Sequence, residues 1–222
     1  MQDIYTQTHS SVESLEVSKV LRNTYALLAV TLLFSAVCAV ASMAMGIGYG
    51  ASMIMSFSSI GLLWFVLPRT ANSSKGILVV FAVTGLLGAG LGPILNRFMA
   101  MDGGAAMITQ AFGGTALIFF GLSGYVLVTR KDFSFITGFL MTGIMIAFIA
   151  MIANIFFQIP ALSLAISALF MFISSGLILW QTSQIIHGGE RNYILATASL
   201  YVSLYNIFVS LLHILGFAGG DD

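Results

Sequence analysis

Charged residues are scarce in this sequence, and those present avoid its long apolar stretches. The 222 residues include eight Lys or Arg and eight Asp or Glu, and 59% are hydrophobic. Seven apolar runs contain none of these charges, and each is long enough to cross a hydrocarbon core of ~30 Å as a helix. Lipid offers backbone groups no partner, so runs of this length must be helical. The sequence predicts an all-α membrane protein with seven transmembrane helices, at 25–47, 50–67, 76–95, 105–128, 135–157, 161–181 and 194–217.

Other absences exclude further classes of protein. The single cysteine, Cys38, excludes an intramolecular disulfide. Acidic and polar residues precede the first run, unlike the basic start of a signal peptide, so we expect that run to be retained. Net charge is zero, which gives no indication of nucleic acid as a partner. We expect a polar cytoplasmic tail over 1–22, a bundle over 23–218 and a short periplasmic tail over 219–222.

Basic residues lie unevenly between the two sides of this topology. One side holds seven of them and the other holds only Arg97. Because Lys and Arg concentrate in short cytoplasmic loops, this asymmetry places the N-terminus in the cytoplasm and the C-terminus outside it. The seven are Lys19, Arg22, Arg69, Lys75, Arg130, Lys131 and Arg191.

Small residues and one proline predict features of the third and fourth spans. Gly85, Gly88 and Gly92 share one face of the third span, and Gly114, Gly121 and Gly124 recur similarly in the fourth. Small faces let helices approach closely in lipid, so both sets predict helix contacts. Pro93 lacks a backbone N–H and predicts a break or kink that frees a carbonyl.

The seventh span carries a stripe of polar residues. Its members recur at steps of three and four, which places them on one helix face directed at the bundle interior. Two interpretations remain open, interhelical hydrogen bonding and the wall of a hydrated cavity or pore. The stripe consists of Ser199, Ser203, Asn206, Ser210 and His213.

Enzymatic motifs are weak or misplaced. The segment from Gly121 to Gly124 matches the Gly-x-Ser-Gly of intramembrane serine proteases, but His213 lies about 28 Å from Ser123 along the bundle axis at 1.5 Å per residue. His187 is on the correct side, in a Gly-Gly loop where no residue is expected to hold it. No phosphate loop or metal-ligand spacing occurs in a span. We therefore expect no catalysis, no metal and no cofactor.

Several segments resemble one known family. The sequence Gly-Leu-Leu-Gly-Ala-Gly-Leu-Gly-Pro-Ile-Leu at 85–95, followed by Gly-Thr-Ala-Leu-Ile-Phe at 114–119, is similar to a motif of the Bax inhibitor, or TMBIM, family of seven-helix proteins. The likeness continues through 153–156, 180–187 and 200–208. The segments at 20–25, 91–96 and 186–190 resemble a bacterial inner-membrane branch of the family in particular.

The resemblance implies two functions. The bacterial branch is associated with the membrane AAA protease FtsH and its membrane regulators, as a slowly degraded substrate that restrains the enzyme. The tail from Met1 to Arg22 would be the part accessible to the protease. Other members leak calcium or protons through a pair of aspartates whose positions correspond to Gln181 and Ser203. Neither residue is a carboxylate, so the resemblance makes calcium an uncertain ligand.

Overall fold

The computed structural model describes residues 2–219, and all regular elements within this range are helical. Seven helical stretches in the described part are long and apolar enough to cross a membrane, which confirms the predicted fold class. The elements are α1 (Gln2–Ala44), α2 (Tyr49–Gly61), the π-helix η1 (Leu62–Val66), α3 (Leu67–Thr70), α4 (Ser74–Gly90), α5 (Gly92–Met99), α6 (Gly104–Thr129), the 3₁₀-helix η2 (Ser134–Ile136), α7 (Thr137–Phe157), α8 (Pro160–Ile186) and α9 (Tyr193–Ala218).

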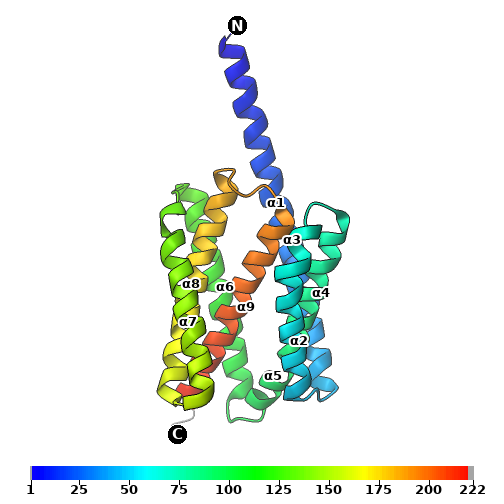
Figure 1. The fold of residues 1–222 in the computed structure, drawn as a ribbon, viewed down its shortest axis with the longest axis vertical. Coiled ribbons are helices and arrows are strands. Elements are labelled where there is room, and N and C mark those ends of the chain that lie inside the picture. Colours follow the sequence, from blue (N-terminus) through cyan, green and yellow to red (C-terminus); the bar gives the residue numbers. More distant parts are fainter. Residues whose placement is uncertain (1, 220–222) are drawn as a thin grey trace.

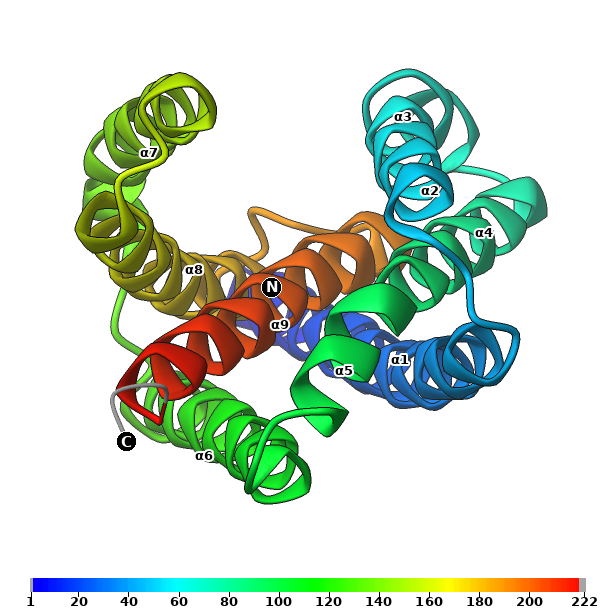
Figure 2. The ribbon, with the colours of Figure 1, turned by 90° about the horizontal axis from the view of Figure 1, so that it is seen from below.

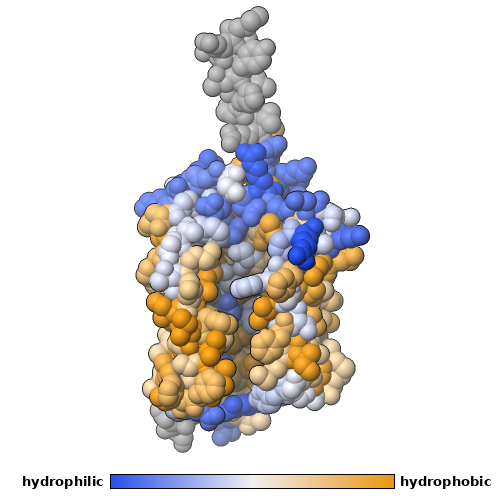
Figure 3. Space-filling view, viewed as in Figure 1, coloured by the Kyte–Doolittle hydropathy of each residue, from blue (hydrophilic) through white to orange (hydrophobic). Residues whose placement is uncertain are grey.

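Helix α9 occupies the centre of the bundle and packs against α1, α4, α6 and α8 (Figures 1 and 2). Helix α7 lies at one edge, against α8, and α2 lies at another, against α4. On the face shown in Figure 3, apolar residues form a broad band between the two ends of the bundle, where hydrophilic residues gather. A central helix surrounded by others and an apolar exterior are the arrangement expected of a bundle dissolved in lipid.

Helix α1 continues well beyond the bundle at its N-terminal side (Figure 1). The backbone is helical from Gln2 through Arg22, so the predicted boundary between a tail and a bundle at that residue does not correspond to a break in the chain. We call residues 2–22 the stem, and the bundle end from which it projects the stem end. Met1 and residues 220–222 of the predicted tails lie outside the described residues.

The predicted break at Pro93 is confirmed. Helix α4 ends at Gly90 and α5 begins at Gly92, because Pro93 has no N–H to donate to the carbonyl of Ala89. The hydroxyl of Ser42 on α1 donates to that carbonyl at 2.6 Å. The hydroxyl of Ser52 on α2 donates to the next one, at Gly90. Side chains from two neighbouring helices thus satisfy the carbonyls that the proline leaves free.

Glycine packing is as predicted in the third span and differs in the fourth. A Cβ added at Gly88 or Gly92 would meet Ser35 or Ser42 of α1, so these glycines allow α1 and α4–α5 to touch. A Cβ at Gly114 would lie 3.1 Å from Leu211 of α9. The prediction for Gly121 and Gly124 is wrong: an added Cβ meets no described atom within 4 Å. Gly121 is exposed and Gly124 is half-buried.

Candidate functional site

The polar stripe of α9 is buried only in part. Ser203 and Ser210 are buried, Ser199 and Asn206 are half-buried, and His213 is exposed at the far end from the stem. Ser203 donates to the carbonyl of Ser199 on its own helix at 3.0 Å. His213 Nδ1 lies 3.5 Å from Ser167 Oγ of α8, which joins the stripe to the neighbouring helix at that end. These contacts are of the interhelical and local kind, and the pore assignment stays a prediction.

The two positions that correspond to the family aspartates are deeply placed. Gln181 on α8 is 3% exposed and Ser203 on α9 is 1% exposed, and these two helices pack along each other. Two neutral side chains in such a place can hydrogen-bond but cannot hold a formal negative charge. The electrostatic feature that would attract a dehydrated cation is therefore missing at these positions.

Several buried polar atoms have no hydrogen-bond partner within the described part of the chain. They come from α1, α6 and α8, and all lie in the half of the bundle nearer the stem. Buried polar groups are nearly always paired, so such a concentration requires an explanation. The atoms are Thr24 Oγ1, Tyr25 OH, Ser123 Oγ, Trp180 Nε1, Gln181 Nε2 and Thr182 Oγ1. Apart from Gln181 they were not predicted as site residues; the available signal was hydroxyl residues within otherwise apolar runs.

Tyr201 is a second polar centre that sequence analysis did not single out. Its side chain is 2% exposed, near the middle of α9. Its hydroxyl donates to the carbonyl of Thr84 on α4 at 3.2 Å and also bonds Ser35 Oγ of α1. One phenol therefore connects three helices where the core is otherwise apolar, next to the core residues Leu28, Val83 and Leu204.

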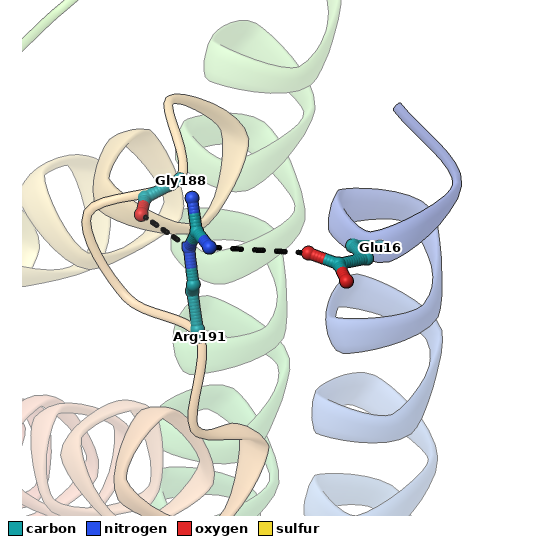
Figure 4. A network of polar contacts seen from close by, with 3 residues as sticks. All are labelled: Glu16, Gly188 and Arg191. Carbon is teal, nitrogen blue, oxygen red and sulfur yellow. Dashed lines mark hydrogen bonds and ion pairs between the residues drawn. The ribbon is translucent and has the colours of Figure 1, made fainter. Parts of the chain in front are cut away.

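A cleft of about 480 Å³ opens at the stem end, between the stem and the α8–α9 loop. Arg191 of the loop bridges it, with its guanidinium 3.9 Å from the carboxylate of Glu16 and its Nε donating to the carbonyl of Gly188 at 3.3 Å (Figure 4). Both charged side chains are largely exposed, so the ion pair is weak on its own. The cleft is lined by Glu16, Val17, Lys19, Val20, Asn23, Ile185, Gly188, Glu190, Arg191 and Tyr193.

The α6–α7 loop is attached to α8 at the same end. The buried Ser183 accepts from the N–H of Phe133 at 3.0 Å, and His187 Nδ1 lies 2.9 Å from the carbonyl of Ser183. The backbone carbonyl of Ser183 is thus a partner for His187, although the sequence of the glycine-rich loop predicted none. The hydroxyl and N–H of Ser134 donate to Asp132, which holds the pKa of that carboxyl below its ordinary value although desolvation opposes the shift.

Comparison with known proteins decides the family. The family model described as inhibitor of apoptosis-promoting Bax1 matches residues 17–220. The chain belongs to the Bax inhibitor family. A relative in Escherichia coli strain K12, named modulator of FtsH protease YccA, is 55% identical over 221 residues, which cover 100% of both chains. An uncharacterized protein of Pseudomonas aeruginosa is 52% identical over the full length of both, and an uncharacterized membrane protein of Vibrio cholerae is 45% identical over 99% of this chain and 98% of its own.

As a Bax inhibitor family protein, the chain combines the seven-helix membrane fold with a neutral interior at the two positions where the sequence resemblance implied aspartates. The buried polar atoms without a partner among the described residues belong instead to four hydroxyls, one carboxamide and one indole. The two chemistries differ, because a carboxylate can change charge with pH, whereas a hydroxyl or carboxamide cannot do so near neutrality.

Proposed function

We propose that this chain is a non-enzymatic, multi-pass protein of a bacterial inner membrane that binds and restrains the AAA protease FtsH. Its N-terminus would lie in the cytoplasm and its C-terminus in the periplasm, as the distribution of basic residues predicts. Identity of 55% along the whole chain with a protein named modulator of FtsH protease supports the proposal. The observation that carries it is the stem, a helical segment about 30 Å long if all 21 residues rise 1.5 Å each, whose N-terminal part continues α1 past the bundle.

A stem followed by a packed bundle suits a substrate that a protease grips but extracts slowly. A terminal segment that few neighbours hold is a ready starting point for a pulling enzyme. Beyond it, extraction must separate α1 from α4, α5 and α9, which include the contacts of Ser35 and Ser42. Exposing the backbone of a membrane helix to lipid is costly, which slows each such step. The enzyme would be occupied during that time.

Deleting residues 3–12 tests the proposal, because it shortens the stem and leaves Glu16 and the bundle in place. We expect the variant's half-life in cells with active FtsH to lengthen to the value in cells without the protease. We also expect copurification with proteolytically inactive FtsH to fall. Replacing residues 3–12 by Gly and Ser at the same length is the matched control. This variant should keep the normal half-life if the length of the stem, and not its sequence, determines whether FtsH can grip it. An unchanged half-life and undiminished copurification of the deletion variant would overturn the stem's role.

A conducting path is the second candidate, because the buried Nε2 of Gln181 has no partner within the described residues and would find one in a hydrated path. We expect liposomes that contain the native protein to pass little calcium between pH 6 and 8, because neither Gln181 nor Ser203 offsets the dehydration of a cation. The double variant Gln181→Asp with Ser203→Asp supplies both carboxylates and serves as the gain-of-function control. Native flux equal to that of the double variant would favour the leak over a purely regulatory role.

A further inference from the structure

Three unpaired hydroxyls form one layer across the bundle. The main core cluster includes Leu28 of α1, Phe119 of α6 and Ile178 of α8. Residues four apart lie on the same helix face. The residue one turn closer to the stem end than each of these three therefore also faces the interior of the bundle. These residues are Thr24, Ser123 and Thr182, and the hydroxyl of each is buried and unpaired in the described residues.

Helix α9 passes through the bundle at the same level. Tyr201 belongs to the core cluster, and Thr197 lies one turn from it toward the stem. Thr197 Oγ1 donates to the carbonyl of Thr24 at 3.2 Å, so α1 and α9 meet at this level. Gln181, next to Thr182, adds a buried carboxamide whose Nε2 has no partner in the described part of the chain. We call Thr24, Ser123, Gln181 and Thr182 the polar layer.

The hydroxyls of Thr24, Ser123 and Thr182 do not donate to the backbone carbonyl one turn earlier in their own helix, which is the nearest acceptor. Hydroxyl residues in a helix commonly donate to the carbonyl one turn earlier. Thr31, Thr115 and Thr197 do so here, at 2.7 to 2.9 Å. Thr24, Ser123 and Thr182 make no such bond. A hydroxyl that leaves its own carbonyl unused, in a protein surrounded by lipid, requires another hydrogen-bonding group in front of it.

The cleft at the stem end lies over this layer. One further turn from Thr24, Thr182 and Thr197 reaches Val20, Ile185 and Tyr193, and these three residues line the cleft of about 480 Å³. Its rim is balanced in charge, with Glu16 and Glu190 against Lys19 and Arg191. The order along the axis is therefore a cleft open to water, a layer of unpaired neutral polar groups and an apolar core.

We propose that the cleft and the polar layer together form a blind, water-filled inlet that binds water and small uncharged hydrogen-bonding molecules. Water in the inlet would pair with the hydroxyls and the carboxamide, since a polar site with several partners is where buried water is stable. The layer has no formal charge, so the inlet does not select cations. The core cluster that includes Leu28, Phe119 and Ile178 closes the inner end of the inlet. The inlet is therefore not a path across the membrane. This site is independent of any contact with FtsH.

Thiol labelling tests the inlet, because Cys38 is the chain's one cysteine and can be replaced first. In a Cys38→Ser background, Thr182→Cys and Ser123→Cys are small changes on two different helices. Ile178→Cys, one turn deeper on α8, is the matched control below the polar layer, and Ser73→Cys marks full exposure. Each full-length variant is treated with a cationic and with an anionic methanethiosulfonate in sealed vesicles of both orientations.

We expect Thr182→Cys and Ser123→Cys to react from the stem side, more slowly than Ser73→Cys. They should react at least about tenfold faster than Ile178→Cys, because methanethiosulfonates react with the thiolate, which forms readily only where water reaches the sulfur. Relative to its own rate at Ser73→Cys, each reagent should be slowed by a similar factor in a neutral inlet. Equal, slow rates at positions 178 and 182 would overturn the inlet, as would labelling from the opposite side. A preference for the cationic reagent much stronger than that at Ser73→Cys would overturn the neutrality of the inlet.

Discussion

At the residue scale, Tyr201 is the most consequential polar side chain in the apolar core. Its hydroxyl satisfies the carbonyl of Thr84 and the hydroxyl of Ser35, so three helices share one hydrogen-bonding centre. Interhelical bonds in membranes contribute only modestly on average, but a buried carbonyl that loses its partner keeps the full penalty of desolvation. Tyr201 is therefore important because the carbonyl of Thr84 and the hydroxyl of Ser35 would be left unpaired without it.

Tyr201→Phe should lower the free energy of unfolding by about 1 to 3 kcal/mol, since the ring remains and only the two hydrogen bonds are lost. Unfolding in mixed micelles by a denaturing detergent measures this difference. Tyr205→Phe, one turn along the same helix, is the control, because none of the described hydrogen bonds uses its hydroxyl. Equal losses for the two variants would show that the bonds of Tyr201 carry no special weight.

Asp132 gives a residue-scale prediction for pH. Hydrogen bonds from Ser134 hold its pKa below the ordinary value, which is about 3.9. The stabilisation by the charged carboxylate is therefore complete above that ordinary pKa and is lost as pH falls through the lower pKa of the folded protein. A carboxyl NMR titration in micelles should show Asp132 titrating below the ordinary range. Ser134→Ala should move the pKa upward, and an unchanged titration would contradict the assigned cause.

At the element scale, close contact between α1 and α4–α5 organises one side of the bundle. Glycines at 88 and 92 bring the backbones together, and the hydroxyls of Ser42 and Ser52 then reach the carbonyls at the proline break. Close approach and hydrogen bonding depend on each other here, because a hydroxyl on a one-carbon side chain has a short reach. The fourth span shows the opposite case, with Gly121 facing outward.

Gly88→Ala and Gly121→Ala form a matched pair for this interpretation. The first places a Cβ against Ser35 and should cost about 1 to 3 kcal/mol of unfolding free energy by overpacking. The second meets open space in the described chain and should be neutral or stabilising by up to ~1 kcal/mol, because Ala is the better helix former. The same detergent unfolding assay compares them. A larger loss from Gly121→Ala would indicate that α6 has a partner on its outer face.

Ser42 and Pro93 should be energetically coupled. Ser42→Ala alone should cost about 1 kcal/mol, because the carbonyl of Ala89 loses its donor. In a Pro93→Ala background, the restored N–H at position 93 can donate to that carbonyl, so the same serine change should cost less. A double-mutant cycle measures this coupling free energy. Additive losses would mean that Ser42 acts through packing alone.

At the scale of the whole molecule, the spans were predictable and their interior chemistry was not. Apolar runs without charge define seven helices because lipid imposes length and backbone pairing on each. The break at Pro93 follows from one missing N–H. By contrast, the outward orientation of Gly121 and the unpaired state of Thr24 and Ser123 depend on which faces of different helices meet. The spacing along one helix does not contain that information, which is also why the stripe of α9 left two interpretations open.

The stem and the bundle are joined by the pair of Glu16 and Arg191, and this contact gives a prediction for the whole protein that rests on the proposed function. If extraction by FtsH begins at the stem, loosening its base should speed degradation. Glu16→Arg and Arg191→Glu each place like charges across the cleft and should shorten the half-life in cells. The change should be no more than about fivefold, because an exposed ion pair contributes at most ~1 kcal/mol.

The double variant with Glu16→Arg and Arg191→Glu restores opposite charges at the same two positions, and its half-life should return toward that of the native chain. Net charge is then also unchanged, which separates the pairing from a general effect of charge on the protease. In cells without FtsH activity all four proteins should persist equally. If the double variant is degraded as fast as either single variant, the contact in Figure 4 does not hold the stem, and resistance to extraction resides in the contacts of α1 inside the bundle.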